Sequence, residues 1–322
     1  MPSEGSPPSP PRVALVFPVF NEEGNLPDLR RRLTAVLSAL PSYGFRIVLV
    51  DDHSADGTRD LCRRWCAEDS RVSYLRFSRN FGSHAACRAG IEAADADAVV
   101  VMAADLQDPP EDIPRLIDEW RRGAHVVWAV RTAREGEPLS STVPAGVYYW
   151  FMRRVAGLDL PPTGADFLLL DRAVRTAILA FPERSSSLFA LVSWMGFRQA
   201  SIPYVKQARH AGRSGWTFRK KVRLFLDSVV SFTLWPLRLV TVLGFGFAAG
   251  GLLYACLLVV LRLRGAIEVQ GWTALMVVCL VGFGSVMMAL GILGEYLWRA
   301  LEQVRARPRF LVEEQVPLGE EG

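Results

Sequence analysis

Two long runs without a charged residue constrain this chain more than any other feature of its sequence. Residues 239–261 and 272–294 contain no Asp, Glu, Lys or Arg. As helices that rise about 1.5 Å per residue, both runs can cross the roughly 30 Å hydrocarbon core of a bilayer. The alternative, a pair of buried helices in a large soluble core, is uncommon for two such runs near one terminus. We therefore predict a two-helix transmembrane hairpin over residues 236–298.

Basic residues flank these runs unequally. They lie before the first run and after the second at Arg219, Lys220, Lys221, Arg223, Arg238, Arg299, Arg305, Arg307 and Arg309, whereas the connection carries only Arg262 and Arg264. Because cytoplasmic segments are enriched in Lys and Arg, this predicts a multi-pass protein of the inner (plasma) membrane with both termini in the cytoplasm. The formal net charge is only +4, which gives no case for a nucleic-acid partner.

The rest of the chain divides by composition. Residues 1–11 are rich in Pro and Ser without an apolar core, which indicates a disordered lead-in and not a signal peptide. Residues 12–218 mix charged and apolar residues as a globular domain does. Residues 143–156 have the pattern of an amphipathic helix. Residues 219–235 predict an interfacial amphipathic helix, and 299–322 are assigned as a cytoplasmic tail.

Gly246 and Gly250 form a GxxxG pair within the first apolar run. Such pairs allow two helices to pack closely. The packing can be within the chain or between subunits, so a homo-oligomer is one of two alternatives.

Short runs rich in β-branched residues alternate with helix-like stretches in the first part of the chain. The predicted strands are 13–19, 45–50, 72–77, 98–102 and 125–130, and the predicted helices include 26–40, 58–67 and 111–122. This alternation predicts an α/β domain with a mostly parallel, Rossmann-like sheet. In such sheets ligands bind at the carboxyl ends of the strands.

Polar side chains follow each predicted strand. They include Asn21, Glu22, Asp51, Asp52, Ser54, Asp56, Asn80, Asp105, Gln107, Asp108 and Arg131. No glycine-rich loop of the GxGxxG or GxxxxGK type is present, so a ligand here does not hold its phosphates as it does in dinucleotide enzymes or kinases.

Seven segments together carry a resemblance to a known family. They are VFPVFNEEGNLPDL, VLVDDHSADGT, SRNFGSHAACRAG, ADLQDPPEDIPRL, TGADFLLLDR, RHAGRSGW and LGEYLWRALEQVRARPRF. The chain resembles, over most of its length, the family 2 glycosyltransferases of the GT-A fold that act on polyprenyl phosphates, such as dolichyl-phosphate mannose synthase and the bacterial undecaprenyl-phosphate glucose and aminoarabinose transferases. The resemblance implies inverting transfer of a sugar from a UDP- or GDP-linked donor to undecaprenyl or dolichyl phosphate.

The resemblance also implies roles for the donor-binding residues. Asp105 and Gln107 would hold Mg²⁺ or Mn²⁺ on the donor diphosphate, and oxygen ligands at a strand end suit such hard ions. The nucleotide would be bound by Pro18, Val19, Glu22, Asp51, Asp52 and Ala104. For the two adjacent aspartates the alternative is loop capping with Ser54 and Asp56. We expect at least one of them to contact the nucleotide.

A lipid phosphate is already anionic at neutral pH, so positioning and charge stabilisation should matter more than a strong base. The catalytic set is assigned as Asp105, Asp166, Arg131 and Arg209, and the acceptor phosphate is assigned to Arg131, Arg134 and Ser214. Asp166 resembles the family's aspartate near the reaction centre, with helix capping as its alternative. His84, at the start of a helix, is left out of the catalytic set.

Two further functions stay open at the level of sequence. Ala103 stands where the family frequently has an aspartate, and Gly215 where it usually has a lysine. Both departures favour a catalytically weak or dead scaffold that binds nucleotide sugar. A processive polysaccharide synthase would need more membrane spans and a QxxRW-type motif, and neither is present.

Overall fold

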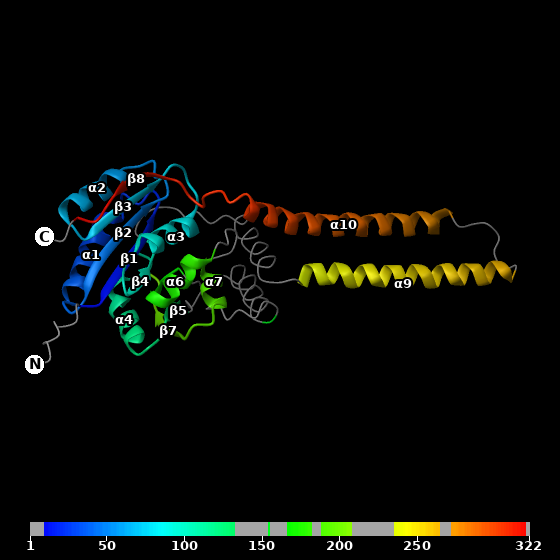
Figure 1. Cartoon of the computed structure of the whole chain (residues 1–322), viewed down its shortest axis with the longest axis horizontal. Helices are drawn as coiled ribbons and strands as arrows, with labels where there is room; N and C mark the ends of the chain where they lie inside the picture. Colours follow the sequence, from blue (N-terminus) through cyan, green and yellow to red (C-terminus); the bar gives the residue numbers. More distant parts are fainter. Residues whose placement is uncertain are drawn as a thin grey trace, which may run out of the picture. The chain divides into compact units, whose positions relative to one another are not determined.

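The computed structural model describes residues 10–132, 154, 166–181, 188–207, 235–264 and 272–319 (Figure 1). The chain forms two compact units: unit 1 consists of Met1–Phe225 and Pro308–Gly322, and unit 2 of Leu226–Arg307. The helix predicted over 143–156 lies outside the described residues except for Arg154, and the interfacial helix predicted over 219–235 lies outside them except for Trp235.

The described part of unit 1 contains one sheet of eight strands. The strands are β1 (Arg12–Val19), β2 (Gly44–Asp51), β3 (Val72–Phe77), β4 (Ala98–Val101), β5 (Val126–Arg131), β6 (Leu168–Asp171), β7 (Gln199–Tyr204) and β8 (Val312–Val316). Their order is β7-β5-β6-β4-β1-β2-β3-β8. Only β6 and β8 run against the other strands. The predicted α/β fold with a mostly parallel sheet is therefore confirmed.

Helices cover both faces of this sheet. They are α1 (Leu26–Ser38), α2 (Thr58–Glu68), α3 (Ser83–Ala93), α4 (Ile113–Arg121), α6 (Arg172–Ala180) and α7 (Leu188–Trp194), with a 3₁₀ turn, η1 (Pro110–Asp112), before α4. Helices α1, α2 and α4 share one apolar cluster with the sheet, and α3, α6 and α7 share the other. The result is a helix–sheet–helix sandwich.

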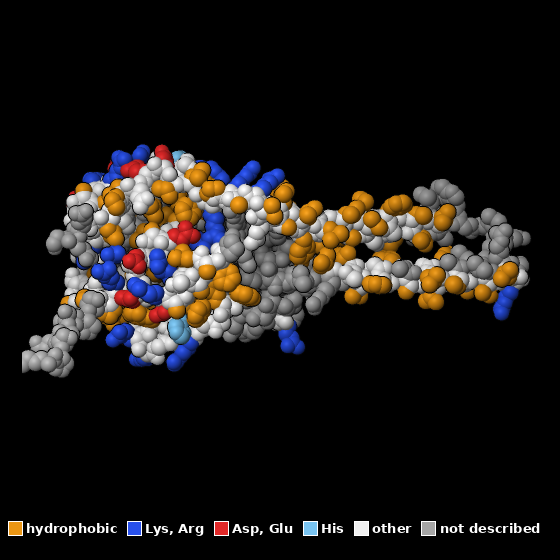
Figure 2. All heavy atoms as spheres, in the orientation of Figure 1, with side chains coloured by type: hydrophobic (Ala, Val, Ile, Leu, Met, Phe, Trp, Pro, Cys, Tyr) orange, Lys and Arg blue, Asp and Glu red, His pale blue; other side chains and the backbone are white. Residues whose placement is uncertain are grey.

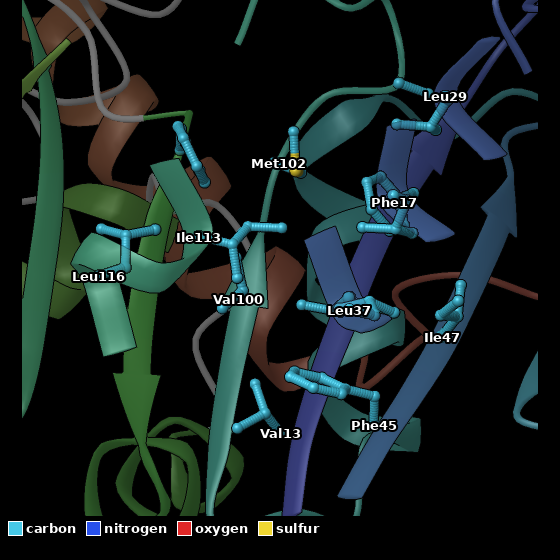
Figure 3. Packing of buried hydrophobic residues seen from close by; sticks show 14 of the residues in the cluster. Val13, Phe17, Leu29, Leu37, Phe45, Ile47, Val100, Met102, Ile113 and Leu116 are labelled. Carbon is cyan, nitrogen blue, oxygen red and sulfur yellow. The ribbon is translucent and has the colours of Figure 1, made fainter. Parts of the chain in front are cut away.

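Strand β1 shows how the sequence builds the two clusters. Successive side chains of a strand point to opposite faces, so Leu15 and Phe17 join the cluster of α1 while Ala14 and Val16 join the cluster of α3. All four side chains are fully buried. Figure 3 shows side chains of α1 and α4 against the strands of the first cluster, with Leu37 beside β1 and β2. Because both faces are covered, the middle of this strand has no room for a polar group.

The five predicted strands are present within one or two residues of the predicted bounds, but β6, β7 and β8 were not predicted. Strand β6 is a four-residue, largely apolar run, and periodicity alone does not identify so short a segment. Strand β8 reads VEEQV, without apolar alternation, and lies within residues 299–322, which the sequence analysis assigned to a tail. These residues instead contribute an edge strand to the sheet.

Unit 2 contains two long helices, α9 (Trp235–Leu263) and α10 (Trp272–Val304). Many of their large apolar side chains are exposed, for example Phe245 at 74% (Figure 2). Among the described residues, Val281–Val304 is long and apolar enough to cross a membrane, with a mean hydropathy of 1.4, and Leu239–Tyr254 is a shorter apolar stretch. The two-span hairpin stays a prediction.

The close contact between α3 and β1 at Gly90 provides a test of the packing. A Cβ added at Gly90 of α3 would lie 2.1 Å from Cγ1 of Val16 in β1. We expect Gly90→Ala to lower the free energy of unfolding by about 1–3 kcal/mol, because overpacking outweighs the better helix propensity of alanine. Gly44→Ala is the control, since its Cβ would meet Cγ of Arg12 at an ordinary 3.7 Å. Equal melting temperatures for the two variants would contradict this packing.

Candidate active site at the carboxyl edge of the sheet

The ends of β1 and β2 lie side by side at the carboxyl edge of the sheet. Pro18 and Val19 pair in register with Val50 and Asp51. The backbone N–H of Asp52 donates to the carbonyl of Val19 at 3.0 Å. The structure thus brings together the candidate nucleotide residues of the first two strands.

Hydrogen bonds join the loops that follow these two strands. The N–H of Asn21 donates to Oγ of Ser54 at 2.9 Å, and the N–H of Ala55 donates to Oδ1 of Asn21 at 2.8 Å. Asn21 has a positive φ of 56°, a conformation that asparagine tolerates better than most residues. The N–H of Glu22 donates to Oγ1 of Thr58 at 2.8 Å. The two loops therefore form one joined surface.

Asp51 is enclosed by its own protein. It is 0% exposed, and Oδ1 accepts the N–H of Ser54 at 2.7 Å. Oδ2 accepts the hydroxyl of Tyr74 at 2.8 Å and Nη1 of Arg76 at 2.5 Å. From the sequence, Asp51 could either contact the nucleotide or cap the loop after β2. In the structure its carboxylate has the capping arrangement and holds that loop through Ser54.

Asp52 supports the next loop along the sheet. Its carboxylate accepts the N–H groups of Phe81 at 2.6 Å and Gly82 at 2.9 Å. Gly82, with φ of 95°, precedes the first residue of α3. Burial raises the pKa of the Asp52 carboxyl, and the two backbone donors oppose that shift. Asp52 thus connects the loop after β2, where the candidate nucleotide residues lie, to the start of α3.

A tight turn after β4 presents the candidate metal ligands. Ala104 is buried and Asp105 is 9% exposed. Leu106 has a positive φ of 59°, and the N–H of Gln107 donates to Oδ1 of Asp105 at 3.2 Å. Asp108 turns inward, where its Oδ1 accepts the hydroxyl of Tyr204 at 2.5 Å. Burial raises the pKa of Asp108.

The donor atoms of this turn fit a hard divalent ion. Asp105 and Gln107 offer a carboxylate and an amide oxygen, which Mg²⁺ and Mn²⁺ accept. Across the residues that the structure describes, no group of three or more His, Cys, Asp or Glu side chains could enclose a metal. Mg²⁺ commonly combines one or two carboxylates with substrate phosphates and water.

Arg131 and Asp166 lie at the same end of the sheet from β5 and from the segment before β6. Arg131 is in register with Tyr204. The negative charge of Asp166 raises the pKa of Asp108, and the positive charge of Arg131 lowers that of Tyr204, although burial is the largest influence on both. Asp166 is exposed and lies two residues before β6, so it does not precede a helix in the described part of the chain. Arg134, Arg209 and Ser214 lie outside the described residues.

Two side chains of the site were not selected from the sequence. His84 lies in the first turn of α3, 5.1 Å from the Phe189 ring between centroids, and its Nδ1 is buried with no hydrogen-bond partner in the described part of the chain. Arg76 holds Asp51 from within β3. In the sequence, Arg76 could have been noticed as the one charged residue at the otherwise apolar end of β3.

Comparison with known proteins adds to this geometry. A family model described as glycosyl transferase family 2 matches residues 14–169, which include β1 to β5 and Asp166. An uncharacterized glycosyltransferase of Synechocystis sp. is 37% identical over 300 residues, covering 93% of this chain and 94% of the relative. The chain belongs to glycosyl transferase family 2. It is therefore a glycosyltransferase, and its α/β domain has the GT-A fold.

Two further proteins align with most of the chain. The undecaprenyl-phosphate 4-deoxy-4-formamido-L-arabinose transferase of Pseudomonas fluorescens is 36% identical over 304 residues, covering 94% of this chain and 89% of the relative. Among solved structures, a mannosyltransferase from Pyrobaculum calidifontis in complex with GDP-Man and Mn²⁺ aligns with a TM-score of 0.47 and 17% identity, covering 89% and 87% of the two chains.

The buried Nδ1 of His84 leads us to expect that the stability of this glycosyltransferase depends on pH. Burial lowers the pKa of His84 in the folded protein, whereas the unfolded chain binds the proton near the ordinary value of about 6.5. As the pH falls through that value, the unfolded state gains a proton that the folded state lacks, so stability falls. We expect His84→Gln to reduce the loss of melting temperature between about pH 7.5 and about pH 5.5. An identical loss in the wild type and the variant would contradict this.

Proposed function

We propose that the enzyme transfers a sugar from a UDP- or GDP-linked donor to polyprenyl phosphate at the cytoplasmic face of the membrane. The observation that carries this proposal is the joint presence, in one chain, of the Asp105–Gln107 turn at the strand end and of two long helices with exposed apolar side chains. The first suits a charged, water-soluble donor, and the second suits a lipid acceptor. The likeness to an undecaprenyl-phosphate transferase supports the same pairing.

The donor nucleotide is proposed to bind over the joined loops after β1 and β2. Pro18 and Val19 are the last residues of β1, and Glu22 lies in the loop after it. Asp52 follows β2, and Ala104 precedes the turn of Asp105 and Gln107, the metal turn. Asp51 keeps a role in this binding, but an indirect one, because its oxygens are occupied by Ser54, Tyr74 and Arg76. It supports the surface without reaching the ligand.

Asp105 and Gln107 are proposed to hold Mg²⁺ or Mn²⁺ together with the donor diphosphate. When bound, the ion would neutralise charge on the diphosphate as it departs. The buried position of Asp105 and the fixed turn at Leu106 keep both oxygen donors near the strand end. Little side-chain ordering is then required when the donor binds.

The acceptor brings its own nucleophile. A lipid-phosphate oxygen attacks the anomeric carbon, the bond from that carbon to the diphosphate oxygen breaks, and the nucleoside diphosphate leaves with the electron pair. Attack from the opposite face inverts the anomeric centre. Arg131, Arg134, Arg209 and Ser214 are proposed to orient the two phosphates, because guanidinium groups pair well with phosphate oxygens. Asp166 is proposed to orient the transferred sugar near that centre.

We further propose that α9 and α10 span the inner (plasma) membrane, with both termini cytoplasmic. Their exposed apolar side chains need a nonpolar environment, and each helix is long enough to provide a span. Among the described residues, no atom other than those of the adjacent residues and the helix's own backbone lies within 4 Å of a Cβ added at Gly246 or Gly250. These open positions are compatible with packing between copies of the chain, which makes a homo-oligomer part of the proposal.

Transfer into a lipid product tests donor, acceptor and site together. The full chain in detergent is supplied with undecaprenyl or dolichyl phosphate, Mg²⁺ and radiolabelled UDP- and GDP-sugars, and label is measured in the organic phase. We expect one donor to give product, and Asp105→Asn to lower kcat by about 10²-fold or more, because it removes charge from the metal turn. Asp118→Asn, on the exposed face of α4, should keep the wild-type rate.

The outcomes separate the two functions that the sequence left open. Product from one donor that is lost in the Asp105 variant but retained in the Asp118 variant supports the transferase. Binding of UDP or GDP without transfer from any donor would instead favour a nucleotide-sugar-binding scaffold, for which Ala103 would be the first residue to restore to aspartate. Equal rates for the two variants would remove Asp105 from the site.

Removal of divalent ions gives a second test. Because the turn supplies only two oxygen ligands, we expect a chelator such as EDTA to strip the ion and to abolish transfer. Excess Mg²⁺ or Mn²⁺ should restore the rate, whereas Ca²⁺, which takes more ligands at longer distances, should restore less. Full activity in the presence of the chelator would show that Asp105 and Gln107 serve the reaction without a metal.

A further inference from the structure

The strand that follows α10 returns to the sheet of unit 1 and pairs with β3. Strand β8 runs antiparallel to β3, and the N–H of Ser78 donates to the carbonyl of Leu311 at 3.0 Å. The ring of Phe310 stacks on that of Phe77 with 5.0 Å between centroids. The end of the chain is thus anchored beside the carboxyl end of β3.

Two adjacent glutamates of β8 have different partners. Glu314 accepts from Arg59 at 2.7 Å and from Arg63 at 2.5 Å, both on α2. Oε2 of Glu313 lies 3.3 Å from Nε of Arg76 and 3.6 Å from Nδ1 of His53 in the loop after β2. The pairing of β8 with β3 is irregular here: Glu314 is in register with Arg76 and Val312 with Phe77, so Glu313 falls at the irregularity between them. One glutamate therefore contacts a helix, and the other contacts an arginine of the neighbouring strand.

Arg76 connects Glu313 to the loop after β2. Its side chain is 8% exposed, and each of its three nitrogen positions has a partner. Nε points to Glu313, Nη1 donates to Oδ2 of Asp51 at 2.5 Å, and Nη2 donates to the carbonyl of Ser54 at 3.0 Å. A buried guanidinium with this fork geometry fixes the relative positions of the groups it joins.

The same connection reaches the loop after β1. Ser54, held by both Asp51 and Arg76, accepts the N–H of Asn21 through its hydroxyl at 2.9 Å. Asn21 comes two residues after Val19, at the end of β1. A continuous series of polar contacts therefore runs from Glu313 on β8 to the backbone that leaves β1.

We propose that Glu313 is a positioning residue for the donor nucleotide: by orienting Arg76, it fixes the loops after β1 and β2 and so sets donor affinity from the strand that follows α10. This inference rests on the proposed function, which puts the nucleotide on those loops. Glu313 does not touch the ligand. Its side chain is 44% exposed, and Arg76 keeps its ion pair with Asp51, so the charge of Glu313 can be removed without leaving the buried guanidinium unpaired.

Matched variants of the two glutamates test the inference. The full chain in detergent is titrated with UDP and with GDP in the presence of Mg²⁺ by calorimetry, and KM values are then measured for donor and acceptor. We expect Glu313→Gln to weaken nucleotide binding and to raise the donor KM by about two- to fivefold, the range for a partly exposed ion pair. The acceptor KM and kcat should stay at wild-type values.

Glu314→Gln is the control, because it removes two arginine contacts on the same strand without touching Arg76. A purely structural role for β8 predicts an effect of Glu314→Gln at least as large as that of Glu313→Gln. Positioning through Arg76 predicts wild-type nucleotide affinity for Glu314→Gln, even if its melting temperature falls. Equal nucleotide affinities for the two variants would overturn the inference.

Arg76→Lys tests the connecting residue while keeping the positive charge near Asp51. Lysine lacks the fork that reaches Ser54 and Glu313 together, so nucleotide affinity should fall further than in Glu313→Gln. Adding Glu313→Gln to Arg76→Lys should then have little further effect, because coupled residues are not additive. Additive losses would overturn the inference and leave the proposed function intact. A wild type that binds neither UDP nor GDP would overturn both.

Discussion

Burial of the central strands on both faces is the constraint on which the rest of unit 1 depends. The residues of β1 from Val13 to Phe17 are 0% exposed, as are Val99 and Val100 of β4. A polar side chain there would lose its water without gaining a partner, which is strongly unfavourable. The polar side chains of the candidate site therefore lie in the last residues of the strands or after them, and the parallel direction of β1, β2, β3 and β4 brings those residues to one edge.

The aspartates of that edge have two kinds of place in the structure: Asp51 and Asp52 support loops, and Asp105 is a candidate metal ligand in a turn. Asp51 and Asp52 use their oxygens on protein donors, and so give each buried carboxylate the hydrogen bonds that burial requires. Asp105 instead occupies a turn whose backbone is fixed by a positive φ at Leu106. Within this turn, Oδ1 of Asp105 accepts the N–H of Gln107 at 3.2 Å.

The sequence was enough to predict the fold class and the edge, because both depend on local patterns. The strands β1 to β5 are regular apolar runs between helices, and the polar residues follow them directly. Strands β6 and β8 could not be predicted, since their places depend on pairing with β4 and β3, far away in sequence. The support role of Asp51 could not be separated from ligand contact for the same reason: Tyr74 and Arg76 belong to the next strand.

The place of β8 makes unit 1 discontinuous in sequence, because its sheet is completed only by residues that follow α10. Without β8, the edge of β3 would present unpaired backbone groups, and Arg76 would lose one of its two carboxylates. Strand β8 has a polar sequence with two glutamates, a composition that discourages further pairing at an exposed sheet edge. One segment thus closes the sheet, protects its edge and contacts the residue that holds the loop after β2. This combination explains why a short polar strand, which a propensity argument would leave as a tail, has a fixed place in the fold.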